Sequence, residues 1–366
     1  MSSTRIYRFL FAGGGTGGHI YPALAVAQQI KLLKPEAEIL FVGAKKKIES
    51  RVVPQYGFNF RSIWISGFSR KFTISNILFP LKVIVSMLQS LLIVSKFKQK
   101  VAIGCGAYVS GPVIWASSVL GSKIILLEQN SYPGITNRIL EKKAEEIHIS
   151  FDESKKYFRD QKKLKLTGNP VRVNLKIIDR EEALKQFDLD PVKKTVLVLG
   201  GSGGAQTIND AVANSISELI QNNIQIIWQT GQFYFEENKM YECKDVRVLP
   251  FIENMSAAFS ACSILIARAG ATTIAEVSYL SLPVIFVPSR NVAANHQYKN
   301  AKAISDASAA ILIEDKNLKL SLSKIVIEVI NDDKKLAELR KNISAFAKPD
   351  AAKVIAESAI RLAEAI

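Results

Sequence analysis

Two glycine-rich segments have the residue types needed to bind phosphate. Residues 13–19 follow the apolar run at 9–12, and residues 200–204 follow the apolar run at 196–199. Each segment leads into a stretch whose apolar residues have helical spacing. Glycines let a ligand approach the backbone, and the unpaired N–H groups and dipole of a helix N-terminus attract an anion. The pair predicts two nucleotide-type domains that bind phosphorylated partners, although glycine also occurs in ordinary turns.

A third segment, residues 268–276, follows the apolar run at 264–267. Its threonines could cap a helix whose first turns end at Glu276. A helix N-terminus suits a diphosphate, and a carboxylate slightly further along could accept hydrogen bonds from paired ribose hydroxyls. The alternative is a structural helix with a good cap.

Two other enzyme classes fit parts of these patterns. Residues 13–18 match G-x-G-x-x-G, but the second predicted strand runs into lysines 45–47 instead of the acid that a dehydrogenase uses on the ribose. Residues 200–204 match G-x-S-x-G, with His296 downstream in the order of an α/β-hydrolase. The hydrolase alternative leaves the first glycine loop and the basic N-terminal half unexplained.

Metal and disulfide chemistry find little support in the sequence. The D-x-D pair Asp188 and Asp190 lies before a predicted strand, away from both glycine loops, so a solvated loop is favoured. The 3 histidines and 3 cysteines have no metal-ligand spacing, and the odd cysteine count favours a reducing compartment. We expect no metal site and no cofactor.

The net charge of +15 belongs to the first half of the chain. No Asp or Glu occurs between Glu49 and Glu128, although nine Lys and Arg residues do. An anionic partner is therefore expected. The recognition motifs and interleaved aromatic residues of RNA-binding proteins are missing, so the expected partner is an anionic membrane surface and not a nucleic acid.

An apolar stretch at residues 72–95 lies inside this acid-free window, between basic flanks. Asn76, Pro80, Lys82 and Gln89 interrupt it, so we expect no transmembrane helix. The helix either packs wholly against its own domain or rests its leading end in a bilayer interface, which the basic flanks favour. The N-terminus has no apolar signal region, so the cytoplasmic face is predicted. The predicted membrane contacts are Arg70, Lys71, Ile74, Ile77, Leu78, Leu81 and Lys82.

Strand and helix signals alternate along both halves, which predicts α/β domains with doubly wound parallel sheets. Helical periods stand out at residues 22–33 and 112–120, and a helical tail is predicted at 350–364. The Gly-Asn-Pro at residues 168–170 looks like a hinge. The strands are predicted at residues 9–12, 39–42, 60–65, 101–105, 123–127, 146–149 and 164–167, and then at 195–199, 225–228, 246–250, 264–267, 283–287 and 309–313.

The order and spacing of several motifs closely resemble the MurG family over nearly the whole chain. These enzymes are the bacterial UDP-N-acetylglucosamine (UDP-GlcNAc) transferases that complete lipid II for peptidoglycan. The motifs are the segments at residues 14–19, 108–112, 128–130, 168–172, 200–202, 268–271, 295–297 and 349–352.

The resemblance implies a GT-B fold, with two Rossmann-like domains facing a cleft. Residues 1–167 would form the acceptor domain, residues 168–348 the donor domain, and a tail at 349–366 would pack back on the first. It also implies an inverting, metal-independent transfer of GlcNAc from UDP-GlcNAc to the muramyl C4 hydroxyl of undecaprenyl-diphosphoryl-MurNAc-pentapeptide. That acceptor lies in the cytoplasmic leaflet, so the enzyme would be peripheral to the inner membrane.

Site residues are carried over from the family by matching position. His19 is expected to be the general base, because imidazole titrates near neutral pH, or else only to bind acceptor phosphate. The acceptor diphosphate is expected at Gly14, Gly15, Tyr108 and Ser110. The UDP-GlcNAc site is expected at Thr16, Gly17, Gly18, Asn130, Arg172, Ser202, Ile252, Ala271, Thr272, Thr273, Ile274, Ala275, Glu276 and Gln297.

Two positions depart from the family pattern. Ala107 replaces a glycine before Tyr108, which puts the conformation of the acceptor loop in doubt, and Ala269 stands where a serine is usual. The alternative function is that of a related GT-B enzyme acting on another lipid or a small aglycone. A binding or scaffold protein without activity is disfavoured because both glycine loops are intact.

Overall fold

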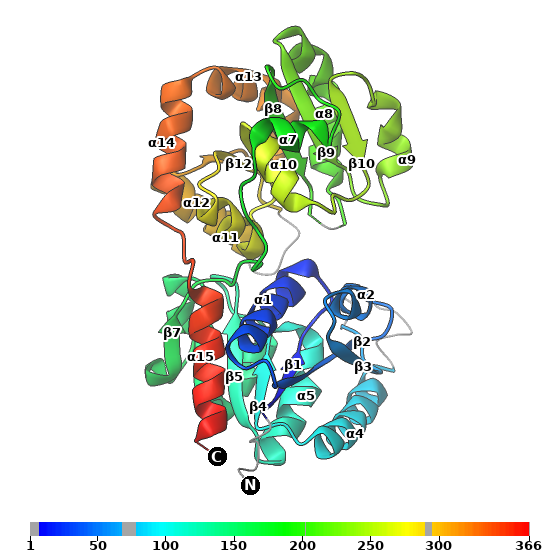
Figure 1. The fold of residues 1–366 in the computed structure, drawn as a ribbon, viewed down its shortest axis with the longest axis vertical. Coiled ribbons are helices and arrows are strands. Elements are labelled where there is room, and N and C mark those ends of the chain that lie inside the picture. Colours follow the sequence, from blue (N-terminus) through cyan, green and yellow to red (C-terminus); the bar gives the residue numbers. More distant parts are fainter. Residues whose placement is uncertain (1–6, 68–77, 202, 290–294, 366) are drawn as a thin grey trace. The chain divides into compact units, whose positions relative to one another are not determined.

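The computed structural model describes residues 7–67, 78–201, 203–289 and 295–365. It divides into two units, one comprising Met1–Val173 with Lys348–Ile366 and the other comprising Asn174–Ala347. Each unit is a parallel sheet with helices on both faces (Figure 1). The predicted fold class, two doubly wound α/β domains, is confirmed.

The first unit has a seven-stranded sheet in the order β3-β2-β1-β4-β5-β6-β7. This order reverses between β1 and β4, so the loops after these two strands flank the switch point where such sheets bind ligands. Its strands are β1 (Arg8–Ala12), β2 (Glu38–Ala44), β3 (Asn59–Ile63), β4 (Val101–Gly104), β5 (Lys123–Glu128), β6 (Glu146–Ile149) and β7 (Leu164–Leu166). Its helices are α1 (Gly17–Leu33), α2 (Ile48–Gln55), α4 (Phe79–Phe97), α5 (Ala107–Val119), α6 (Ile135–Leu140), η1 (Glu141–Lys143), η2 (Asp152–Tyr157), η3 (Gln161–Lys163) and α15 (Ala351–Glu364).

The second unit repeats the plan with six strands in the order β10-β9-β8-β11-β12-β13. Its switch point lies between β8 and β11. The strands are β8 (Lys194–Leu199), β9 (Ile224–Gln229), β10 (Val246–Leu249), β11 (Ile264–Ala267), β12 (Val284–Phe286) and β13 (Ile311–Leu312). The helices are α7 (Arg180–Lys185), α8 (Gln206–Gln221), α9 (Phe235–Asn238), η4 (Lys239–Tyr241), α10 (Met255–Ala261), α11 (Ala271–Tyr279), α12 (His296–Asp306), α13 (Asp315–Ile330) and α14 (Asp333–Ser344).

Central strands such as β4 and β11 are continuous apolar runs because helices bury both faces of each sheet there. In β1, Phe9 and Phe11 face the core shared with α1 and α15, while Leu10 and Ala12 face the core shared with α5. This alternation is the two-residue period of a strand. Both faces of β1 are therefore buried in the first unit.

Helices α1 and α5 begin earlier than the sequence indicates. The helical periods start at Pro22 and Pro112, yet α1 begins at Gly17 and α5 at Ala107, with each proline inside its helix. In both cases the chain enters the helix almost directly from the loop that follows a strand. The helix N-termini are thereby brought to the switch point.

The boundary between the two units lies after Val173. The sequence suggests a hinge slightly earlier, at Gly168. Gly168, at φ +86°, packs so closely on Lys348 that an added Cβ would lie 2.4 Å from its side chain. Arg172 places its guanidinium 4.2 Å from the centre of the Tyr21 ring on α1. These contacts hold the segment to Val173 against the first unit, on which α15 also packs through α1.

Candidate active site

The first glycine loop is held by a buried carboxylate that sequence reasoning missed. Glu49 is fully buried and accepts hydrogen bonds from the N–H of Gly15, at 2.8 Å, and of Ala44, at 2.9 Å. Gly14 and Gly15 have positive φ, and a Cβ on Gly14 would collide with the Glu49 carboxylate. The only sequence signal was the place of Glu49 shortly after β2.

Glu49 limits the backbone N–H groups of this loop that are available to an anion. The Gly15 N–H is already engaged by a carboxylate, so it does not serve a phosphate in this conformation. The first turn of α1 contains Gly17 and Gly18, has no acidic residue, and receives no side-chain cap from Thr16. The backbone groups of this loop that remain available to an anion are therefore those at the start of α1.

The His19 ring is oriented by two oxygen atoms. Its Nδ1 lies 2.9 Å from the carbonyl oxygen of Cys105 and 3.2 Å from Oε1 of Gln129. Because both partners accept hydrogen bonds, Nδ1 carries the proton, and in the neutral ring Nε2 carries the lone pair. Gly106, at φ +88°, packs on the ring, and a Cβ there would lie 2.9 Å from it. This tautomer is the one a base acting through Nε2 requires.

Tyr108 and Ser110, both predicted to bind acceptor diphosphate, lie in different environments. The Tyr108 ring approaches the first glycine loop, 3.8 Å from where a Cβ of Gly15 would stand. Burial, and then the charge of Glu49, raise the pKa of Tyr108. Ser110 is fully buried, and its hydroxyl lies 2.7 Å from the Ala12 carbonyl and 2.5 Å from the Gly106 carbonyl. The prediction for Ser110 needs correction, because a buried hydroxyl directed at backbone carbonyls positions α5 and does not reach a diphosphate.

Asn130 lies in a loop that is shaped by Glu128 at the end of β5. The buried Glu128 carboxylate accepts hydrogen bonds from the N–H of Asn130, at 3.0 Å, and of Gly134, and from the amide of Asn137, both at 2.9 Å. Burial raises the pKa of Glu128, and these hydrogen bonds oppose that rise. Asn130 itself is half-buried, so its side chain is presented by a fixed loop.

In the second unit, the glycine loop packs closely on the loop after β9. A Cβ on Gly204, which has φ +78°, would lie 2.0 Å from the Thr230 carbonyl oxygen. Gln229 donates to the Gly201 carbonyl at 3.2 Å and accepts from the Ile252 N–H at 2.9 Å. Gln229, which sequence reasoning missed, thus connects the glycine loop to Ile252. Ser202 lies outside the described residues.

Helix α11 begins at the switch point of the second unit. Its N-cap is Gly270, which has no side chain to cap it, and its first turn contains no acid. The prediction that threonines cap this helix is wrong, because Thr272 and Thr273 lie within its first turn. Ala271, Thr272, Thr273, Ile274, Ala275 and Glu276 follow one another along the helix from its first residue. Glu276 lies 4% exposed in the second turn.

The other predicted donor residues are divided between the units. Gln297, at the start of α12, accepts a hydrogen bond from the Ser289 N–H at 2.9 Å. Ile252 is 2% exposed, and its N–H is occupied by Gln229. Arg172 belongs to the first unit and stacks on Tyr21. The first unit therefore supplies a cation beside the start of α1, whereas Gln297 and Ile252 belong to the second.

Helix α4 leaves its leucines exposed. The described part of the predicted membrane contact includes Leu78, which is 42% exposed, and Leu81, which is 50% exposed. Lys82 donates to the Ser66 hydroxyl at 3.0 Å. Because these leucines are exposed, the alternative that the helix packs wholly against its own domain is wrong. Arg70, Lys71, Ile74 and Ile77 lie outside the described residues.

The buried side chains of α4 are Ser86, Ser90 and Val94, one narrow stripe that packs towards α5. By length and composition alone, α4 could cross a membrane, and only 17% of its most apolar window is buried. A helix with buried serines and exposed leucines is the reverse of an ordinary surface helix.

Comparison with known proteins places both units in one enzyme family. The glycosyltransferase family 28 N-terminal domain matches residues 9–149, and the family 28 C-terminal domain matches residues 195–355. A UDP-N-acetylglucosamine–N-acetylmuramyl-(pentapeptide) pyrophosphoryl-undecaprenol N-acetylglucosamine transferase of Flavobacterium psychrophilum is 45% identical over 98% of each chain. Transferases of the same name from Christiangramia forsetii and Bacteroides thetaiotaomicron are 42% and 41% identical, over 97% and 98% of each chain.

Solved structures agree on the fold. The crystal structure of Acinetobacter baumannii MurG matches with a TM-score of 0.73 and 23% identity, covering 97% of this chain and 99% of that one. The calicheamicin glycosyltransferase CalG4 matches with a TM-score of 0.68 and 11% identity, covering 98% and 99%. The second of these is a glycosyltransferase by name.

Proposed function

The chain belongs to the family of UDP-N-acetylglucosamine–N-acetylmuramyl-(pentapeptide) pyrophosphoryl-undecaprenol N-acetylglucosamine transferases, and we propose that it carries out their reaction. It transfers GlcNAc from UDP-GlcNAc to the C4 hydroxyl of MurNAc in undecaprenyl-diphosphoryl-MurNAc-pentapeptide, lipid I, and so forms lipid II. The observation that supports this most strongly is 45% identity over 98% of the chain. The presence of a glycine loop at each switch point supports the same conclusion, because such loops suit phosphate binding.

Most of the UDP-GlcNAc contacts are assigned to the second unit. The uncapped start of α11 offers N–H groups to the diphosphate, and Ser202 would add a hydroxyl from the glycine loop. Glu276 is assigned to the ribose and Gln297 to the sugar. Ile252 has a buried side chain and an occupied N–H, so its backbone carbonyl is the group left to contact the uracil.

His19 is assigned as the general base. Its Nε2 takes the proton from the C4 hydroxyl while that oxygen attacks C1 of GlcNAc on the side opposite the departing UDP. The Cys105 carbonyl and the Gln129 amide, which hold Nδ1–H, stabilise the imidazolium that forms. A single displacement of this kind inverts the anomeric centre.

No cofactor and no metal ion are needed in this proposal. The departing diphosphate gains negative charge, which the start of α11 and the Arg172 guanidinium would stabilise. Thr16, Gly17, Gly18 and Asn130 complete the donor set from the first unit. Gly14, Gly15 and Tyr108 are assigned to the acceptor side, where the acceptor diphosphate would lie against the first glycine loop.

The enzyme is proposed to work as a peripheral protein on the cytoplasmic face of the inner membrane. The exposed leucines of α4 supply apolar contact, and the excess positive charge of the first 165 residues supplies attraction to anionic lipid. The residues assigned to this contact include Leu78, Leu81 and Lys82. A nucleic-acid partner is not proposed.

Transfer of labelled GlcNAc from UDP-GlcNAc into a short-chain analogue of lipid I, with EDTA present, tests the function. We expect incorporation by the wild type and a raised KM for UDP-GlcNAc in Gln297→Ala, with lipid I affinity unchanged. A protein that binds UDP yet incorporates nothing would refute the assignment. It would favour the alternative, a GT-B transferase for another lipid or aglycone.

A further inference from the structure

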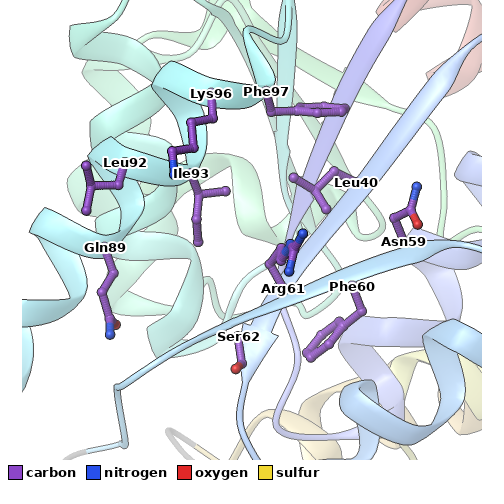
Figure 2. Close-up of a pocket in the computed structure, with 10 residues that line it drawn as sticks. All are labelled: Leu40, Asn59, Phe60, Arg61, Ser62, Gln89, Leu92, Ile93, Lys96 and Phe97. Carbon is purple, nitrogen blue, oxygen red and sulfur yellow. The ribbon is translucent and has the colours of Figure 1, made fainter.

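A cavity of about 900 Å³ lies between β3 and α4 in the first unit, a volume typical of ligand pockets. Because β3 is the edge strand of the sheet, the cavity lies at the sheet edge and away from the switch point. Figure 2 shows its lining, with the strand residues on one side and the α4 residues on the other. The lining residues are Leu40, Asn59, Phe60, Arg61, Ser62, Gln89, Leu92, Ile93, Lys96 and Phe97.

The cavity contains cationic groups and no acid. Arg61 on β3 and Lys96 on α4 are both exposed, and within the described residues neither forms an ion pair or a hydrogen bond. No Asp or Glu occurs anywhere between Glu49 and Glu128, so neither element can supply a carboxylate. Two cations facing one cavity without an anion leave a charge for a ligand to neutralise.

One polar contact fixes the cavity's shape. The Trp64 N–H, just beyond β3, donates to Oε1 of Gln89 on α4 at 2.7 Å. This hydrogen bond fixes the distance between strand and helix at one end of the cavity. It also leaves the Gln89 amide nitrogen as a further donor among the lining groups.

The cavity is also apolar, and it continues into the exposed face of α4. Leu40, Ile93 and Phe97 are buried or half-buried in the lining. Leu92 is 62% exposed and belongs at once to the cavity and to an apolar stripe along the helix. The stripe comprises Leu81, Ile84, Leu88 and Leu92, at three- and four-residue spacing on the side opposite the buried serines. A ligand in this cavity can therefore reach the same apolar surroundings as the stripe.

We propose that this cavity binds one anionic phospholipid from the bilayer on which α4 rests. The headgroup phosphate lies between Arg61 and Lys96, and the first part of an acyl chain lies along Leu92, Ile93 and Phe97. This inference rests on the membrane attachment proposed above and adds to it. The stripe adsorbs to any bilayer, whereas the cavity selects a lipid that carries negative charge.

Calorimetric titration of the full chain with dihexanoyl-phosphatidylglycerol, below its micelle concentration, tests the inference. The zwitterionic dihexanoyl-phosphatidylcholine and inorganic phosphate are the comparison ligands. We expect the anionic lipid to bind about tenfold more tightly than either. The double variant Arg61→Gln/Lys96→Gln should lose about tenfold or more in affinity, since each cation near a lipid phosphate contributes about fivefold.

The matched control is Arg51→Gln/Lys98→Asn, which removes two charges from the same acid-free window outside the cavity. It should change affinity for the soluble lipid by less than about twofold, because neither side chain lines the cavity and exposed charges are screened by salt. Equal losses in the two double variants, or equal binding of the two lipids, would overturn the inference. So would inorganic phosphate binding as tightly as the lipid, which would identify a site for a soluble anion.

Transfer to a soluble acceptor separates this inference from the proposed function. Both double variants should keep wild-type transfer rates, which also shows that they fold. If the wild type fails to transfer, the proposed function is at fault. If transfer is normal and lipid selectivity is absent, only the lipid cavity is refuted.

Discussion

His19 illustrates how single residues determine the chemistry of the first unit. The two oxygens around Nδ1 come from the loop after β4 and from the end of β5, and they fix the tautomer without a carboxylate. A ring held in this way keeps its Nε2 lone pair in one direction. Gln129 is therefore a positioning residue for His19.

We predict that His19→Ala lowers kcat by about 10²- to 10⁴-fold, the usual contribution of a general base. KM for UDP-GlcNAc should stay near the wild-type value, because the His19 side chain is assigned to proton transfer and not to donor binding. Steady-state kinetics measure both. Near-normal turnover by His19→Ala would rule out the base role and leave only phosphate binding.

Ala107 is a second residue whose effect is local. It has φ +64°, a left-handed conformation that costs a non-glycine residue about 1–2 kcal/mol. Ala107→Gly should raise the free energy of unfolding by about 0.5–1 kcal/mol, after allowing for the greater freedom of glycine in the unfolded chain. Denaturant unfolding measures this. Ala116→Gly, inside the same helix, should be destabilising, and stabilisation by both substitutions would contradict the explanation.

The glycine loops, His19 and the residues of α11 could be predicted as site residues from the sequence, because each belongs to a recognisable motif or matches the family pattern. It could not reveal Glu49 or Gln229, since each acts through one buried side chain that meets a loop distant in sequence. Ser110 was misassigned for a related reason. Its place beside a motif said nothing about its full burial.

At the scale of elements, the strands could be predicted and the helix faces could not. The strand at residues 101–104 is an uninterrupted apolar run because both faces are buried. Helix α4 is apolar on nearly every side, so its composition does not say which side is buried. Contact with α5 selects the stripe of Ser86, Ser90 and Val94 and leaves the leucines outside.

A network around Glu146 attaches α15 to β6. The carboxylate pairs with His148, with Lys165 at 2.7 Å, and with Arg361 of α15. Burial by itself would raise the pKa of Glu146, but hydrogen bonds from His148, Lys165 and Arg361 outweigh it and hold that pKa well below the usual range. A lowered pKa means that the folded state favours the carboxylate, so the stabilisation is present at neutral pH and is lost as the pH falls.

We predict that Glu146→Gln lowers the free energy of unfolding at pH 7 by about 2 kcal/mol, the usual effect of removing a charged partner. Between about pH 5 and pH 3, wild-type stability should fall more steeply than that of the variant. Urea unfolding at several pH values tests this, with the exposed Glu153→Gln as the control. Parallel pH profiles for the wild type and Glu146→Gln would contradict the role of the network.

At the scale of the whole molecule, the charge and the two units carry different functions. The excess of +15 lies in the first 165 residues, and this unit also carries the exposed leucines of α4. The C-terminal helix belongs to the same unit, where Tyr7 donates to Glu364 at 3.0 Å. Charge counting predicts the positive charge of this unit. The place of α15 depends on contacts across the full length of the chain, so only the family resemblance indicates it in advance.

The most direct test of the account is the position and configuration of the bond formed in the product. The wild type, with EDTA present, would be given UDP-GlcNAc, whose sugar is α-linked, and a lipid I analogue, and the product analysed by NMR. A single displacement with His19 as base predicts GlcNAc joined to C4 of MurNAc in the β configuration. An α-linked product, or GlcNAc attached to another hydroxyl, would contradict the proposed mechanism.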